Sequence, residues 1–143
     1  MHDTKSLFLD CDNDILCLPK DINVDDLEFS PTSLDGLEVS PIKGNPFTEA
    51  ALFAAKFSPG ARNPLHVHTY QYEAAIWKGQ FKHYIPDVDE NDRNLKIFNV
   101  GEAYSIPAGQ VHQDINVSDT EPVILLIYFH GPFDVTPVDT KPK

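Results

Sequence analysis

Short segments that alternate apolar and polar residues, or that form brief apolar runs, make up most of the chain after residue 36. They occupy residues 37–43, 49–60, 72–85, 95–118 and 123–131. Twelve prolines and seven glycines are scattered between and within these segments and break them into strand-length pieces. Such spacing is typical of many short strands joined by turns and argues against a helical bundle. The pattern therefore predicts an all-β sandwich or barrel.

The distribution of these segments predicts one domain with two appendages. Residues 1–35 are acidic and carry few periodic segments, so we expect an N-terminal arm with one or two short strands. Residues 36–135 form the strand-rich domain, and residues 136–143 form a polar, proline-containing tail. A chain of 143 residues with 41% hydrophobic residues has the size and composition for a single core.

The charge narrows the classes of partner. With 22 acidic and 11 basic residues, the formal net charge is −11, which repels nucleic acid and anionic membrane surfaces. The chain has no run of 18 apolar residues and no basic, apolar leader at its N-terminus, so we expect a cytoplasmic protein without a membrane partner. Cys11 and Cys17 lie too far apart for a C-x-x-C metal motif, and we expect two reduced thiols.

Two histidines in the middle of the chain are candidates for metal ligands. Because residues i and i+2 of a strand project to the same face, His66 and His68 point together. Glu73 follows after a stretch that can form a bend, and on the next strand it shares a face with Trp77. If the charged Lys78 points to solvent, Glu73 points toward the histidines. A solvated strand would show the same spacing, so a second feature is needed.

The second feature is a third histidine that follows a tight turn. Pro107 and Gly109 favour the turn, and His112 then opens a strand with Asp114 and Asn116 on its face. Three imidazoles with a carboxylate form a nitrogen-rich site that suits Fe(II), Zn, Ni, Cu or Mn. The three histidines also leave coordination positions open for water or substrate.

These two stretches resemble the two sequence motifs of the cupin superfamily. The residues that match are Gly60, His66, His68, Glu73 and Gly79 in the first motif, and Gly101, Pro107, Gly109, His112 and Asn116 in the second. The first motif departs from the family at its end, because five residues rather than the usual six separate Glu73 from Gly79. The resemblance implies a jelly-roll β-barrel with one metal in its mouth. It further implies that His66, His68 and His112 bind the metal and that Glu73 is the fourth ligand.

Within the cupins, the chain is most similar to two groups with different roles. The acetylacetone and dihydroxyacetophenone dioxygenase-like group implies one divalent metal per chain, Fe(II) before Zn or Ni, and cleavage of a carbon–carbon bond in a small carbonyl compound with O2. The cupin half of zinc-binding anti-sigma factors implies instead a non-catalytic sensor that binds zinc or a small ligand. We favour the enzyme because the open coordination and the expected apolar wall suit a substrate.

Several other residues have expected places around this site. Gln71 and Gln113 flank the ligands, so we expect them to hydrogen-bond the imidazoles. Trp77 is expected to line the pocket. His83 shares a face with Phe81, and two interpretations stay open for it: a pocket wall or a structural histidine. Small barrels with exposed apolar strand faces often pair, so we expect a homodimer.

Overall fold

The computed structural model describes residues 22–86 and 95–138, and within these ranges nearly every regular element is a strand. The exception is one 3-10 turn, η1 (Val24–Asp26). The strands are β1 (Ser30–Pro31), β2 (Leu37–Lys43), β3 (Ala51–Phe57), β4 (His66–Val67), β5 (Tyr72–Lys78), β6 (Phe81–Tyr84), β7 (Ala103–Ile106), β8 (Gln113–Asn116), β9 (Val123–Phe129) and β10 (Thr136–Pro137). The predicted all-β class is confirmed. Cys11 and Cys17 lie outside the described residues, and no described helix is long and apolar enough to cross a membrane.

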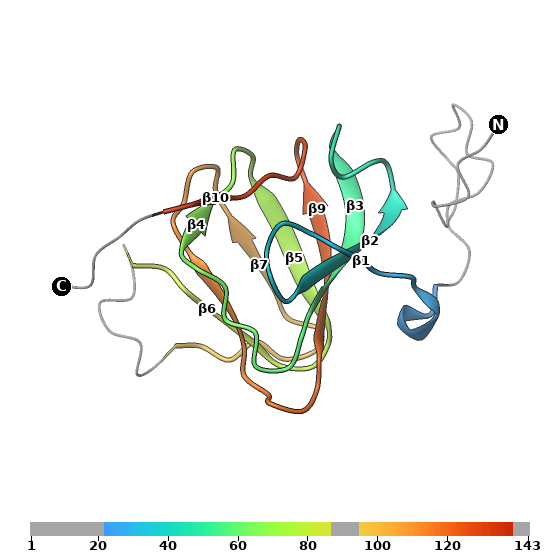
Figure 1. Cartoon of the computed structure of the whole chain (residues 1–143), viewed down its shortest axis with the longest axis vertical. Coiled ribbons are helices and arrows are strands. Elements are labelled where there is room, and N and C mark those ends of the chain that lie inside the picture. The colour runs from blue at the N-terminus through green and yellow to red at the C-terminus, as the bar shows by residue number, and fades with distance from the viewer. Residues whose placement is uncertain (1–21, 87–94, 139–143) are drawn as a thin grey trace.

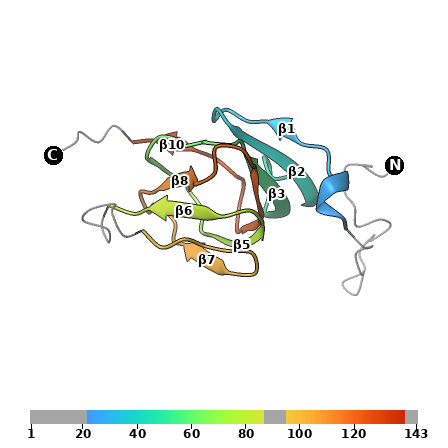
Figure 2. The same ribbon diagram turned by 90° about the horizontal axis from the view of Figure 1, so that it is seen from below.

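All the strand pairs are antiparallel and form one large and two small sheets. The large sheet has the order β1-β2-β3-β9-β5-β7, and the small sheets pair β4 with β10 and β6 with β8. The large sheet forms one side of a flattened barrel and the small sheets close the other side (Figures 1 and 2). β1 and β10, which fall in the predicted arm and tail, are thus hydrogen-bonded to the main domain.

The main core lies inside this barrel and is rich in aromatic side chains. Phe53 and Phe57 project inward from alternate positions of β3, as expected for a strand with one face on the core. Phe53 stacks on Phe129 of β9 with ring centroids 5.8 Å apart, and Phe57 lies 5.2 Å from Phe81 of β6. The first contact lies within the large sheet, and the second joins the large sheet to the small sheet of β6 and β8.

A second, smaller apolar cluster covers the outer face of the large sheet. Its buried members are Ile42, Ala54 and Ile124, and residues Ile22, Val24, Leu27 and Phe29 of the N-terminal segment pack on them. Trp77 also packs in this outer cluster. The N-terminal segment therefore stabilises the large sheet from the side opposite to the barrel interior.

Strand β5 faces the opposite way from the sequence prediction. Tyr72 and Ile76 are buried in the main core, whereas Glu73 and Trp77 lie on the outer face. The prediction took Lys78 as the marker of the solvent face. The register with β9 shifts between Ile76 and Lys78, so the alternation is broken before Lys78. The predictions that Glu73 points toward the histidines and that Trp77 lines the pocket are therefore wrong.

Candidate metal centre

Backbone pairing brings the two histidine motifs together. His66 begins β4, and His112 lies immediately before β8. The two residues form an antiparallel bridge, with His66 N donating to His112 O at 2.9 Å and His112 N donating to His66 O at 3.0 Å. The Pro-x-Gly turn is hydrogen-bonded to the first histidine motif, because Gly109 N donates to His68 O at 3.0 Å. The turn thus sets the third histidine beside the first two.

The three imidazoles form a compact cluster in the barrel interior. One ring nitrogen of each histidine lies within 4.8 Å of the ligating atoms of the other two. The exposed fractions of His66, His68 and His112 are only 0%, 5% and 0%. Ring centroids are 4.3 Å apart for His66 and His112, and 4.9 Å apart for His66 and His68. The structure therefore groups the three histidines that the sequence singled out.

The orientation of the rings suits a metal. In each of the three histidines, Nδ1 lies within hydrogen-bonding distance of a backbone carbonyl oxygen. The acceptors are Pro64 O for His66 at 2.7 Å, Asp134 O for His68 at 2.5 Å and Gln110 O for His112 at 3.1 Å. A carbonyl oxygen can only accept, so each Nδ1 carries the proton and each Nε2 presents a lone pair. This arrangement is the usual one for histidines that bind a metal.

A buried carboxylate, that of Asp114 on β8, stands beside the cluster. Its Oδ2 atom lies 3.3 Å from His66 Nε2, and its Oδ1 atom lies 3.7 Å from His112 Nε2. The Asn63 amide donates to Asp114 Oδ2 at 3.0 Å, and Asn63 Oδ1 accepts from Asp114 N at 2.9 Å. The carboxylate is therefore held in place by a neighbouring side chain. Asp114 was expected on the same face of the strand as His112, and its carboxylate does lie beside the His112 ring.

The charges of these groups are strongly coupled. Burial raises the pKa of Asp114, but His112, His66 and the Asn63 hydrogen bond outweigh burial and hold that pKa well below its usual range. Burial lowers the pKa of His66, and the contact with Asp114 more than offsets this and leaves it raised. Burial, with the neighbouring His112 and His66, lowers the pKa of His68 to about 4. A permanent carboxylate among imidazoles attracts a cation.

We expect the metal-free protein to lose stability as the pH falls from 7 to 5. His68 has a pKa near 6.5 when unfolded and about 4 when folded, so the unfolded state binds its proton first. The difference between these two pKa values corresponds to a contribution of roughly 3 kcal/mol to folding stability. This contribution is present above pH 6.5 and is lost as the pH approaches 4. The raised pKa of His66 acts in the opposite sense and offsets part of this loss. Urea unfolding after chelation measures the change, which should shrink in His68→Gln; an equal pH dependence in both proteins would contradict it.

One buried tyrosine, Tyr72, and one partly buried tyrosine, Tyr104, contribute hydroxyl groups to the interior. Tyr72 Oη lies 3.2 Å from His112 Nε2, and the rings of Tyr72 and Tyr104 are 6.0 Å apart. Burial raises the pKa of both hydroxyl groups well above 10, so both stay protonated. The His83 ring packs against two aromatic rings, with centroids 4.4 Å from Tyr104 and 5.2 Å from Phe98, and His83 is not among the residues that line the cavity beside the histidines. The alternation of apolar residues at 72, 74 and 76 was the signal that could have placed Tyr72 inside.

Other predicted site residues lie elsewhere. Glu73 is on the outer face with 43% of its side chain exposed, and it contacts His130 Nε2 at 2.5 Å. Gln71 Nε2 donates to Glu73 Oε2 at 2.7 Å, so Gln71 faces solvent rather than an imidazole. Gln113 Nε2 donates to Asn63 O at 2.9 Å and steadies the segment that holds Asp114. Neither glutamine makes the predicted hydrogen bond to a ligand ring.

The space between the histidines and the aromatic core is small. The cavity that His66, His68, Tyr72 and Asp114 help to line has a volume of about 20 Å³. A water needs roughly 10–15 Å³, whereas pockets for small molecules span about 300–1,000 Å³. Phe133 also lines the cavity, and its ring centroid lies 5.8 Å from that of His68. The cavity therefore has room for an ion, and a substrate needs a further opening.

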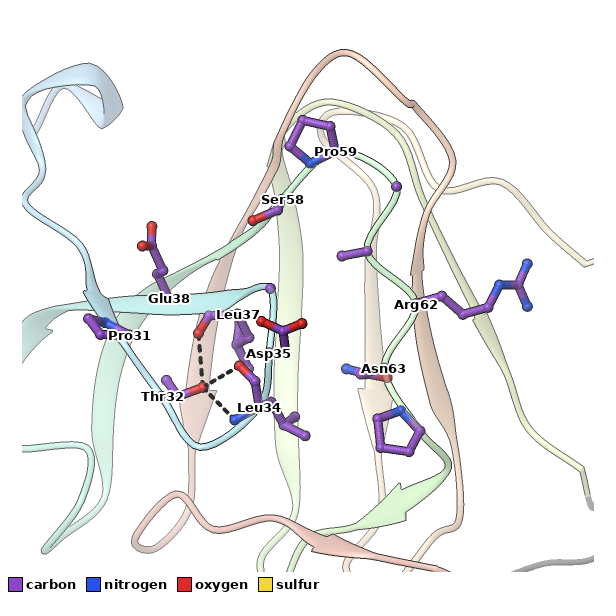
Figure 3. A pocket seen from close by; sticks show the side chains of 14 residues that line it. Pro31, Thr32, Leu34, Asp35, Leu37, Glu38, Ser58, Pro59, Arg62 and Asn63 are labelled. Atoms are coloured by element: carbon purple, nitrogen blue, oxygen red, sulfur yellow. Dashed lines mark hydrogen bonds between the residues drawn. The ribbon is translucent and has the colours of Figure 1, made fainter.

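A larger groove of about 600 Å³ shares part of its lining with this cavity, and the residues that line the groove are drawn in Figure 3. Leu34 and Leu37 line both the groove and the small cavity. The turn that carries Leu34 is fixed by Thr32, whose Oγ1 donates to Leu37 O at 2.9 Å. Asn63 also lines the groove, while the Arg62 side chain points away from it in Figure 3. Asn63 therefore contacts both places: it lines the groove, and its amide donates to the Asp114 carboxylate beside the histidines.

Comparison with known proteins agrees with the fold described above. No family model and no curated protein sequence matches the chain. Among solved structures, the polyketide cyclase RemF from Streptomyces resistomycificus is 18% identical with a TM-score of 0.66, over 87% of this chain and 88% of that one. An RmlC-like cupin from Shewanella frigidimarina is 20% identical with a TM-score of 0.56, over 78% and 88%. An oxalate oxidase is 19% identical with a TM-score of 0.58, over 83% and 63%.

The fold and the cluster together define the class of this protein. It is an antiparallel β-barrel whose interior carries three histidines that could hold one metal ion. The chain has the cupin fold, which is the fold that the resemblance of its two motifs implied.

Proposed function

We propose that the protein is a metal-dependent cupin enzyme that holds one divalent transition metal through His66, His68 and His112. One observation carries this proposal. The Nδ1 atoms of the three clustered histidines all contact backbone carbonyl oxygens, so their Nε2 atoms are left with lone pairs that can bind a metal. Imidazole ligands accept most late first-row metals. We propose Fe(II) as the native ion, with Zn or Ni as alternatives.

The proposed reaction is the cleavage of a carbon–carbon bond in a small diketone or hydroxyketone with O2. A bound metal would supply Lewis acidity toward a substrate that chelates through two oxygens, and would lower the pKa of its acidic carbon. Tyr72 and Tyr104 would remain protonated and offer hydrogen-bond donors, while the aromatic core excludes water. Two of the similar structures are named as enzymes, a polyketide cyclase and an oxalate oxidase, which favours catalysis on this fold.

One observation favours a second candidate, a non-catalytic cupin that senses zinc or a small ligand. The cavity beside the histidines has a volume of about 20 Å³, which fits an ion and leaves no room for a diketone. An enzyme would have to move Phe133 or a neighbouring segment to admit its substrate. A sensor would need no such movement.

Metal analysis followed by oxygen uptake separates the two candidates. We expect protein expressed without added metal to contain about one transition metal ion for each chain. After loading with Fe(II), we expect O2 consumption with at least one member of a panel of β-diketones and hydroxyacetophenones, and none with the metal-free protein. Tightly held zinc without O2 uptake on any compound would overturn the dioxygenase and leave the sensor.

A further inference from the structure

We infer that Asp114 is the carboxylate ligand of the metal centre, in the role that the sequence resemblance gives to Glu73. This inference rests on the proposed binding of a metal by the three histidines. Glu73 cannot serve, because its side chain lies on the outer face of the large sheet and is paired with His130. Asp114 is buried and lies within 4 Å of the Nε2 atoms of two of the three histidines.

The spacing between Asp114 and the imidazoles is close to that between ligands of one ion. When metal–ligand bonds are about 2.1 Å long, neighbouring ligand atoms lie roughly 3.0–3.4 Å apart in octahedral and tetrahedral sites. Asp114 Oδ2 lies 3.3 Å from His66 Nε2, which is within this range, and Oδ1 lies 3.7 Å from His112 Nε2, which is slightly beyond it. A small movement of the Asp114 side chain therefore suffices to bring the carboxylate to an ion shared with these two histidines.

Two buried atoms at this place have no hydrogen-bond partner. They are Asp114 Oδ1 and His66 Nε2. The 3.3 Å contact between His66 Nε2 and Asp114 Oδ2 is close enough for an ion pair but does not have hydrogen-bond geometry. Leaving a buried polar atom without a partner lowers stability, and a charged atom does so more than a neutral one. A cation between these atoms satisfies both, since each presents a lone pair.

Asn63 gives the carboxylate the support that a ligand requires. Its amide donates to Oδ2 of Asp114 and its carbonyl accepts from the Asp114 backbone, which fixes the position of the carboxylate and leaves Oδ1 for the ion. Three neutral imidazoles would leave two positive charges on a divalent metal, and one carboxylate reduces this to one. Burial of the ion in the aromatic interior is then less costly.

The first test compares zinc affinity in Asp114→Asn with that in Glu73→Gln, a matched removal of one carboxylate charge outside the cluster. We expect the Kd for Zn(II), measured by chelator competition, to rise at least about 100-fold in Asp114→Asn, since loss of an indirect partner of a ligand already costs roughly 10–100-fold. Glu73→Gln should stay within about twofold of the unchanged protein. Equal affinity in the two variants, with both folded by circular dichroism, would overturn the assignment.

A structure of the zinc-loaded protein tests the same point without a substitution, and decides it if Asp114→Asn does not fold. We expect an Asp114 oxygen about 2.0–2.2 Å from the ion. A separation beyond roughly 3 Å, or Glu73 turned inward to bind, would refute the assignment of Asp114. If the unchanged protein binds no zinc, the proposed metal centre itself fails; if it binds zinc through the histidines without Asp114, only the present inference fails.

Discussion

Replacing His112 with alanine is expected to abolish the binding of a transition metal. His112 is wholly buried, and its backbone is paired with His66 through two hydrogen bonds, so the substitution removes a ring without releasing the strand. The Nε2 atom that it deletes is one of the three that converge in the interior. Loss of a direct ligand should exceed the roughly 10–100-fold loss of affinity caused by removing a partner of a ligand. Metal content after dialysis and the Kd for Zn(II) measure the effect.

His130→Ala is the matched control for this experiment. His130 is exposed and contacts Glu73 on the outer face, so its loss should leave one bound metal for each chain. Circular dichroism establishes that both variants are folded. Retention of a full complement of metal by His112→Ala would refute the three-histidine centre, and so would an equal loss of metal in both variants.

The three histidines were predictable because their positions depend on local geometry. The alternation of a strand places His66 and His68 on one face whatever the rest of the chain does. The Pro-x-Gly turn fixes the start of the strand after His112, and Gly109 N is bonded directly to His68 O. The two motifs therefore encode both the ligands and the contact that joins them, which is why the fold and this part of the site followed from the sequence.

The side of β5 was not predictable from alternation alone. One charged residue, Lys78, was used to assign the solvent face of the whole strand. The register shift between Ile76 and Lys78 reverses this inference, because a bulge changes the side on which later residues project. The error placed Glu73 and Trp77 on the inner face of the strand. A prediction based on the run of apolar residues before the bulge would have placed both correctly.

The two sequence motifs also did not predict the contacts that distant segments make with the site. His68 Nδ1 is held by the carbonyl of Asp134, and the same residue accepts a hydrogen bond from Thr69 N through its side chain. The Phe133 ring packs near the His68 ring, and the Asn63 amide donates to Asp114 Oδ2. None of these residues belongs to either motif, and none stands at a sequence spacing that would indicate its role. Their roles depend on how the C-terminal segment and the segment before β4 cross the barrel, which is a tertiary property.

The second large effect concerns stability rather than metal binding. Asn116 ends the second motif and is 96% buried, since only 4% of it is exposed. Its amide nitrogen lies within hydrogen-bonding distance of three backbone carbonyl oxygens, and its Oδ1 accepts from Ser118 N at 2.9 Å. The three acceptors are Glu121 O at 2.8 Å, Ser58 O at 3.0 Å and Phe57 O at 3.3 Å. One side chain therefore joins the end of β3 to the turn between β8 and β9.

We expect Asn116→Ala to lower the free energy of unfolding by about 3 kcal/mol or more, because it leaves several buried backbone groups without this partner. Asn116→Asp should be at least as damaging, since a carboxylate cannot donate to the carbonyls and repels them instead. Gln80→Ala removes an exposed amide and should change stability by no more than roughly 0.5 kcal/mol. Urea unfolding of the metal-free proteins measures all three. A loss below about 1 kcal/mol in Asn116→Ala, or full stability in Asn116→Asp, would show that this residue does not clamp the barrel.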